Sequence, residues 1–190
     1  MAWDEVLARL DEFSADNEHF EFYWFPHTEG CLTKRNNRTE GPRRPLPRLR
    51  HWMDDEFLSN TVFELTNRLN RLAPATGRPV NGIAARALGA RTYTDTSYKV
   101  FTSPRRVRFK EQEYAIPREA IPDAVRGIRS LIDSRGWRIS FPIEVRAAAA
   151  DDLWLSTAQG RESGYIAVHR YWRENHLEYF HAVEDLLRGY

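Results

Sequence analysis

The sequence predicts an α+β domain in which helices pack on one face of an antiparallel sheet. Segments with strand-like alternation and segments with helical apolar spacing follow one another along its 190 residues. From residue 107 onward their order is strand, helix, strand, strand, helix, which is most of a split βαβ-βαβ plan. A hydrophobic content of 42% against 29% charged residues is typical of a folded domain with a core of its own.

The N-terminal segment predicts a helix followed by a hairpin. Residues 3–13 repeat apolar side chains at helical spacing, and residues 19–37 hold two β-rich runs on either side of Thr28-Glu29-Gly30. Gly30 is expected to supply the backbone freedom of the hairpin turn. The side chains predicted to line one side of the helix are Val6, Leu7, Leu10 and Phe13.

Residues 40–50 form a connector rich in proline and arginine, which cannot form a long helix. Its arginines could contact a phosphate backbone and its prolines could bind as a polyproline ligand. The acidic residues on either side and a net charge of only +1 favour a solvated loop and no nucleic-acid partner. Helical apolar spacing then predicts a helix over residues 54–72 and a shorter one over residues 79–89.

The C-terminal half supplies the remaining elements. The pattern predicts a helix over residues 118–136, with Pro122 in its first turns and Gly136 closing it. The other predicted elements are strands at residues 107–117, 138–146 and 164–172 and a helix at residues 175–190.

The split βαβ-βαβ plan needs one more strand, so the sheet is expected to lack its last strand. We expect that strand to belong inside the sheet, which leaves an open edge and uncovers part of the last helix's apolar face. That face carries Leu177, Phe180, Val183, Leu186 and Leu187. Self-association through the open edge follows as an expectation.

Several kinds of site have little support in the sequence. Six histidines are scattered along the chain, and His176 and His181 stand five apart rather than the four that helical zinc sites use, so no metal site is predicted. Cys31 has no base near it in sequence and reads as a small buried hydrophobe. A glycine-rich phosphate loop of either standard type is missing from the sequence.

Glu144 and Arg146 are the candidate reactive pair. They share one face of the predicted strand at residues 138–146, whose other face is apolar. A same-face ion pair on a half-exposed strand would contribute little to stability. The functional alternative is a carboxylate held ionised in a pocket by the guanidinium, able to accept a proton while Arg146 stabilises negative charge. The apolar face is predicted to hold Ile139, Phe141, Ile143 and Val145.

Five motifs spread over the whole chain resemble one enzyme family. They are "FEFYWFPHT", "TKRNNRT", "FPIEVR", "DDLWLSTAQGR" and "YIAVH". Each motif is weak alone, but their common order resembles the C-terminal domain of the FAD-linked aldonolactone oxidases and dehydrogenases, relatives of vanillyl-alcohol and alditol oxidases.

The resemblance implies roles for four residues. Glu144 and Arg146 of "IEVR" would face the flavin ring, and His169 of "AVH" would lie in the substrate pocket. Tyr171 shares a strand face with His169 and would bind substrate in the same way. A hydride would pass from a sugar lactone or alditol to the flavin, with Glu144 assisting at the hydroxyl and Arg146 stabilising the electron-rich flavin.

The resemblance also implies a domain organisation. Residues 1–190 would form a single substrate (cap) domain that is truncated at its C-terminus, without the family's FAD-binding domain and its terminal lysine-bearing strand. The partner would then be an FAD-binding domain or chain that holds most of the FAD, in the cytoplasm or at a membrane surface. An interaction module without catalytic function is the alternative, since a surface that normally covers the flavin would be exposed.

Overall fold

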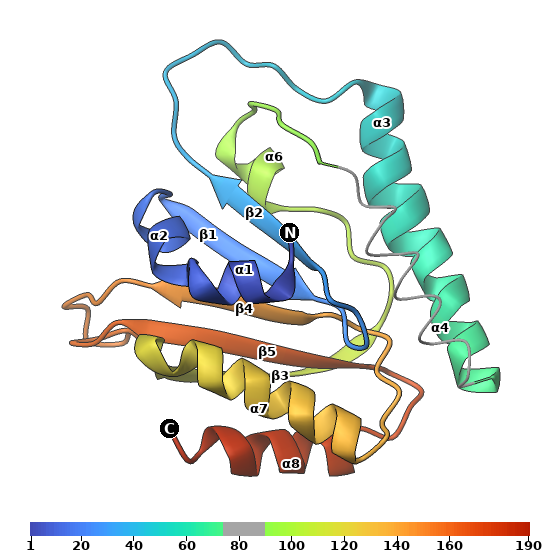
Figure 1. The fold of residues 1–190 in the computed structure, drawn as a ribbon. Helices are drawn as coiled ribbons and strands as arrows, with labels where there is room; N and C mark the ends of the chain where they lie inside the picture. Colours follow the sequence, from blue (N-terminus) through green and yellow to red (C-terminus); the bar gives the residue numbers. More distant parts are fainter. Residues whose placement is uncertain (74–89) are drawn as a thin grey trace.

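The computed structural model describes residues 1–73 and 90–190, so the helix predicted at residues 79–89 lies outside the described residues. The elements in chain order (Figure 1) are α1 Trp3–Ala8, α2 Leu10–Ala15, β1 His19–Trp24, β2 Cys31–Asn36, α3 Arg48–Trp52, the π-helix η1 Met53–Val62, α4 Phe63–Leu72, α6 Ser97–Phe101, β3 Phe109–Pro117, the 3₁₀ turn η3 Arg118–Ala120, α7 Ile121–Ser134, β4 Ile143–Ala148, β5 Ser163–Tyr171 and α8 Leu177–Leu187.

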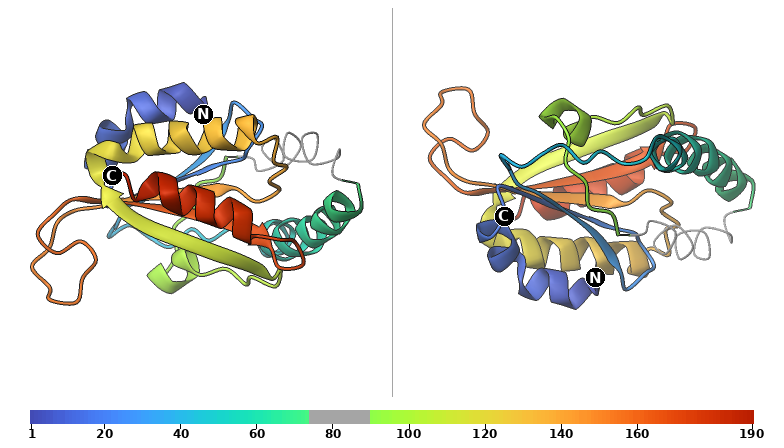
Figure 2. Two further views of the ribbon diagram at one scale, coloured as in Figure 1. Left: turned by 90° about the horizontal axis from the view of Figure 1, so that it is seen from below. Right: turned by 90° about the horizontal axis from the view of Figure 1, so that it is seen from above.

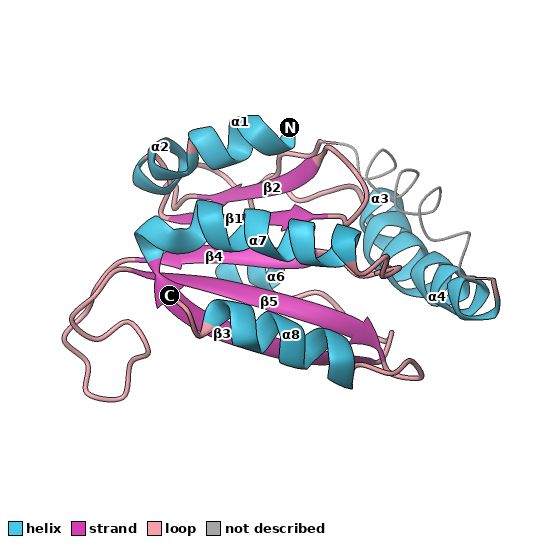
Figure 3. Cartoon of the chain, turned by 60° about the horizontal axis from the view of Figure 1, so that its bottom comes forward, coloured by secondary structure: helices cyan, strands magenta, loops and turns pink. Residues whose placement is uncertain are grey.

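The strands form one antiparallel sheet in the order β2-β1-β4-β5-β3. Helices α7 and α8 run across one face of this sheet, and α1 and α2 lie on the same side (Figures 2 and 3). Among the described residues, the other face has only the short helix α6 and the rod of α3, η1 and α4 at one end, and it is called the open face below. The predicted α+β class, an antiparallel sheet with helices on one face, is confirmed.

The core lies between the sheet and these helices. Phe22 and Trp24 of β1 point into it, as do Val145 of β4 and Ile166 of β5, because alternate strand residues face the same side. All four apolar residues predicted for the first helix are buried, although that helix is broken at Arg9 into α1 and α2. Cys31 is buried at the start of β2, where burial raises the pKa of its thiol to about 12, which fits the small hydrophobe predicted there.

Strand β4 begins five residues later than predicted. Ile139 and Ile143 enter the main core as expected, but residues 138–142 are not paired in the sheet. The chain bends at Phe141, and Pro142 lacks the N–H that a ladder would need. The Phe141 ring therefore packs in a second cluster with Val107 and Tyr171, so its predicted place on the apolar face of the strand was wrong.

The hairpin turn also differs from the prediction. The left-handed backbone is at His27, with φ of 70°, while Gly30 has no positive φ and pairs with Ala2 in an isolated bridge. A histidine tolerates this conformation better than a β-branched residue would. Gly136, with φ of 63°, ends the segment after α7, and Pro122 lies in the first turn of that helix, as predicted.

The sheet has an open edge at β3, and the expected further strand stays a prediction. All five strands are contiguous, and β3 is an edge strand that pairs only with β5 within the described residues. Part of the last helix's apolar face was expected to be uncovered. Leu177 is exposed, but Phe180, Val183 and Leu187 are buried against the domain. Self-association through the β3 edge stays a prediction.

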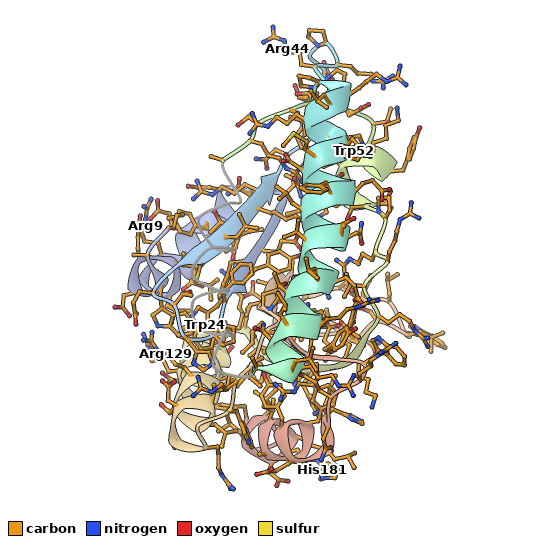
Figure 4. All side chains as sticks on the ribbon, turned by 90° about the vertical axis from the view of Figure 1, so that its right-hand side faces the viewer. Arg9, Trp24, Arg44, Trp52, Arg129 and His181 are labelled. Atoms are coloured by element: carbon orange, nitrogen blue, oxygen red, sulfur yellow. The ribbon has the colours of Figure 1, made fainter. Side chains whose placement is uncertain are left out.

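The helix α3–η1–α4 exposes its apolar side. Figure 4 shows it as one continuous rod with Trp52 near its upper part. Its buried residues are Asn60, Asn67 and Asn70, and Asn67 is completely inaccessible. The exposed apolar stripe consists of Leu49, Trp52, Met53, Phe57, Leu65, Leu69 and Leu72. Across the described ranges, no helix combines the length and apolar character that crossing a membrane requires.

Candidate active site on the open face of the sheet

The candidate pair lies on the open face, because Ile143 and Val145 take the core side of β4. Arg146 Nε lies 3.3 Å from Glu144 Oε1. The Glu144 side chain is only 8% exposed, whereas Arg146 is 44% exposed. The arrangement is therefore a buried carboxylate held by a guanidinium that still reaches solvent, rather than two solvated charges.

Arg146 of β4 reaches across β5 to contact β3. It donates a hydrogen bond of 2.5 Å to Glu113 Oε2 on β3, across the intervening strand β5. Ala167, the β5 residue between Glu144 and Glu113, is fully buried, and its small side chain leaves room for this crossing. Although burial lowers it, the carboxylates of Glu144 and Glu113 raise the pKa of Arg146, so the guanidinium is a permanent positive charge.

Sequence reasoning missed Tyr23, which stands opposite Glu144 on β1. Burial and the neighbouring Glu144 carboxylate raise the pKa of its phenol well above the ordinary value, so Tyr23 remains a neutral hydrogen-bond donor. Glu21 on the same strand pairs with Lys34 at 2.5 Å and continues the charged row toward β2. Alternation places Glu21 and Tyr23 on one side of β1, but only the pairing register brings Tyr23 to Glu144 and Glu21 and Glu113 to Arg146.

His169 of β5 lies on the same face of the sheet as Glu144, two residues beyond Ala167. Its Nδ1 is 3.1 Å from the Pro142 carbonyl oxygen and its Nε2 is 3.6 Å from Glu111 Oε1, and its ring packs against Phe109 and Phe141. Burial lowers the pKa of His169, although Glu111 opposes this. Because a carbonyl only accepts, the neutral ring carries its proton on Nδ1 and presents Nε2 as an acceptor.

Because His169 is neutral in the folded protein, we expect the free energy of unfolding to decrease in acid. Because the folded-state pKa of His169 is lowered, the unfolded chain binds more protons, and stability falls as the pH drops below about 6.5 toward the folded-state value. We expect the stability loss between about pH 7.5 and about pH 5, followed by urea unfolding, to be smaller in His169→Gln than in the parent. The exposed His181→Gln is the control, and an equal acid loss in parent and His169→Gln would contradict the assignment.

Tyr171 occupies a different environment from His169. It is fully buried in the second cluster, and its hydroxyl donates a 2.7 Å hydrogen bond to Glu64 Oε1 on α4. Although burial opposes it, hydrogen bonds from Tyr171 and Arg68 lower the pKa of Glu64. Here Tyr171 ties α4 to the end of β5, and its predicted contact with substrate stays a prediction.

The arrangement combines three functions that acid–base chemistry at a hydroxyl needs. Glu144 is a buried carboxylate that can accept a proton, Arg146 fixes a positive charge beside it, and His169 offers a neutral acceptor nitrogen. Among the described residues, histidine, cysteine, aspartate and glutamate do not gather into a group of three that could hold a metal ion. Arg146 is the residue best placed to meet a cofactor, because it alone of the pair reaches solvent.

Comparisons with known proteins identify the family of the chain. The sequence model of the family described as D-arabinono-1,4-lactone oxidase matches residues 1–190. The L-gulono-1,4-lactone dehydrogenase of Mycobacterium tuberculosis is 39% identical over 186 residues, covering 98% of this chain and 43% of that protein. The L-gulonolactone oxidase of Bos taurus is 27% identical and covers 97% of this chain and 43% of its own length.

The chain thus spans less than half the length of the curated relatives it matches. The family match extends over every residue of the chain, from Met1 to Tyr190. The chain belongs to the D-arabinono-1,4-lactone oxidase family.

Proposed function

We propose that this chain is the substrate (cap) domain of an FAD-dependent oxidoreductase that oxidises a sugar-1,4-lactone of the arabinono-, gulono- or galactonolactone type. The observation that carries the proposal is the buried Glu144 carboxylate with Arg146 at 3.3 Å on the open face, in a chain of this family. The names of the relatives, gulonolactone dehydrogenase and oxidase, support this substrate class.

Each residue has a defined task in the proposed reaction. Glu144 accepts the proton of the substrate hydroxyl, and the neighbouring Tyr23 hydroxyl helps to orient the carboxylate. His169 Nε2 accepts a hydrogen bond from a second substrate hydroxyl, since Nδ1 is held by Pro142. Arg146 keeps Glu144 ionised at neutral pH and adds a positive charge where negative charge develops.

The open face fits one part of FAD rather than all of it. The half-exposed guanidinium of Arg146 suits a redox ring that gains electrons, whereas the sequence has no glycine-rich loop for the phosphates. When bound, FAD would accept the hydride that leaves the oxidised substrate carbon. Most of the cofactor would therefore be held by a separate FAD-binding domain or chain, which is the partner we propose.

Two exposed apolar surfaces suit such a partner. The stripe on α3–η1–α4 includes a stacked pair, Trp52 and Phe57, with ring centroids 6.0 Å apart. In the β4–β5 loop, Trp154 is 90% exposed and Leu155 is 100% exposed. The loop and the α4 helix lie at opposite ends of β5 (Figure 1), so one partner laid across the open face would cover both and enclose Glu144.

The test supplies the proposed partner in trans. The portion of the Mycobacterium tuberculosis relative that this chain does not match is co-expressed with it, and the purified complex is assayed for flavin absorbance and for its loss on adding a gulono- or galactonolactone. We expect a yellow complex that is bleached by lactone. Leu65→Glu together with Leu69→Glu should weaken the complex, whereas Arg126→Glu on the helix-covered side should not.

The same exposed surfaces favour a second candidate, an interaction module without catalytic function. A stable yellow complex that no lactone or alditol reduces would support this candidate against the enzyme.

A further inference from the structure

A pocket outside the open-face site gathers arginines from three separate segments. It has a volume of about 260 Å³ and is lined by Arg71 of α4, Arg138 and Ser140 of the segment before β4, and Arg170, Arg173 and Glu174 at the end of β5, together with two asparagines. Four arginines and a single carboxylate residue thus line one pocket. This concentration stands out in a chain with a net charge of +1.

The single carboxylate does not neutralise the pocket. Glu174 Oε2 lies 3.1 Å from Arg170 Nε, so its charge is committed to Arg170. Burial raises the pKa of Glu174, although Arg170 and Arg71 oppose this shift. Arg170 also donates a 2.7 Å hydrogen bond to the Arg138 carbonyl oxygen, which fixes the wall of the pocket.

The other three arginines lie farther than ion-pair distance from every carboxylate of residues 1–73 and 90–190. Arg71, Arg138 and Arg173 form no ion pair there, whereas most arginines of the described chain, including Arg68 and Arg170, do. Arg173 instead lies over the Trp172 ring, with its guanidinium carbon 4.6 Å from the ring centroid, which restricts its orientation. Unpaired guanidinium groups repel one another and leave their N–H donors for a bound anion.

We propose that this pocket binds a small anion through a phosphate or diphosphate group. The guanidinium groups approach from α4, from the segment before β4 and from the end of β5, so a ligand must present oxygens in several directions, which a tetrahedral phosphate does and a flat carboxylate does not. The volume of about 260 Å³ exceeds the roughly 30 Å³ of one water several times over, so a diphosphate fits better than a single small ion. Glu174 and the C-terminal end of α4 oppose the anion, and the four arginines outweigh them.

Titration calorimetry on the full chain tests the proposal, with inorganic diphosphate as the probe. We expect diphosphate to bind. Arg138→Glu and Arg173→Glu should each weaken its binding about tenfold or more, since each removes charge-assisted hydrogen bonds and adds a negative charge. Arg126→Glu, an exposed arginine on α7, is the matched control and should leave binding unchanged. Arg173→Gln, which removes the charge without reversing it, keeps the test valid where a glutamate variant unfolds.

Titrations with two further ligands, ADP and acetate, show which kind of anion the pocket binds. ADP binding more tightly than diphosphate would assign the site to a nucleotide, and equal binding would assign it to the diphosphate group alone; both support the proposal. Acetate binding as well as diphosphate, or diphosphate binding equally to the parent, Arg138→Glu and Arg173→Gln, would overturn it.

Discussion

Replacing Glu144 by glutamine is expected to lower lactone oxidation by the reconstituted complex by about 10²-fold or more, because general acid–base groups typically contribute 10²–10⁴-fold. Glutamine keeps the size of the buried side chain but cannot accept the substrate's proton. The rate of flavin bleaching after rapid mixing with lactone measures the step directly. KM should change much less than kcat, since the substrate hydroxyl can still form a hydrogen bond to the amide.

Two further variants separate chemistry from electrostatic support. Glu113→Gln removes the other carboxylate that contacts Arg146, at the β3 edge. It should retain most activity because the ion pair of Glu113 in the described part of the chain is with the guanidinium of Arg146. Arg146→Lys keeps the positive charge but cannot span Glu144 and Glu113 together, so an intermediate loss is expected. Near-normal bleaching rates in both Glu144→Gln and Arg146→Lys would show that the pair is structural.

The period-two pattern of β4 predicted the face on which Glu144 and Arg146 lie. Ile143 and Val145 point into the core, so the residues that alternate with them point to the opposite face. The same local logic predicted α7 with its Pro122 start and Gly136 end. Local periodicity succeeds here because each element buries one side of itself, and that preference is written in adjacent residues.

Pairing between distant segments could not be predicted in the same way. The contact from Arg146 to Glu113 depends on β5 lying between β4 and β3, and Tyr23 meets Glu144 only because β1 pairs with β4. No local pattern encodes either register. The strand order could not be predicted for the same reason, since β1 pairs with β4 and β3 lies at the edge.

The helix α3–η1–α4 shows a second limit of periodicity. Its apolar spacing predicted a helix but not the side that faces the domain. Polar contacts hold the opposite side of the helix against the domain. The Asn60 amide donates a 2.8 Å hydrogen bond to the Pro104 carbonyl oxygen and accepts one of 2.7 Å from the Arg106 N–H. The Ser140 hydroxyl donates a 2.7 Å hydrogen bond to the Asn67 amide oxygen. Buried amides with satisfied hydrogen bonds outweigh the exposed leucines here, and the stripe is left for a partner.

Gly164→Ala is expected to give the largest loss of stability of any single-methyl change at a described glycine. A Cβ there would lie 2.3 Å from Ile121 Cγ1 and 2.5 Å from its Cδ1, because Gly164 lets the first turn of α7 approach β5 closely. Overpacking of this kind costs about 1–3 kcal/mol or more. Without the clash, replacing glycine by alanine in a strand interior would raise the free energy of unfolding by about 0.5–1 kcal/mol. A loss of stability would therefore indicate the clash.

Urea unfolding measures the effect, and Gly127→Ala on α7 is the matched control. A Cβ at Gly127 would lie 3.1 Å from Leu186 Cδ2, the movable end of a side chain, and alanine is favoured over glycine within a helix by about 1 kcal/mol. We expect that variant to be neutral or slightly more stable than the parent. Equal stability of Gly164→Ala and the parent would mean that Ile121 can move aside and that α7 is not seated tightly on β5.

A double-mutant cycle then identifies Ile121 as the cause. Ile121→Ala alone should cost about 2–5 kcal/mol, because Ile121 is fully buried and its removal leaves a cavity. In that background both clashing atoms are gone, and the Gly164→Ala methyl group enters the vacated space. The double variant should therefore lose clearly less stability than the sum of the single losses, with a coupling energy of about 0.5–3 kcal/mol. Additive losses would place the strain elsewhere, in the backbone of β5 or at Ile116, whose Cγ1 lies 3.7 Å from the added Cβ.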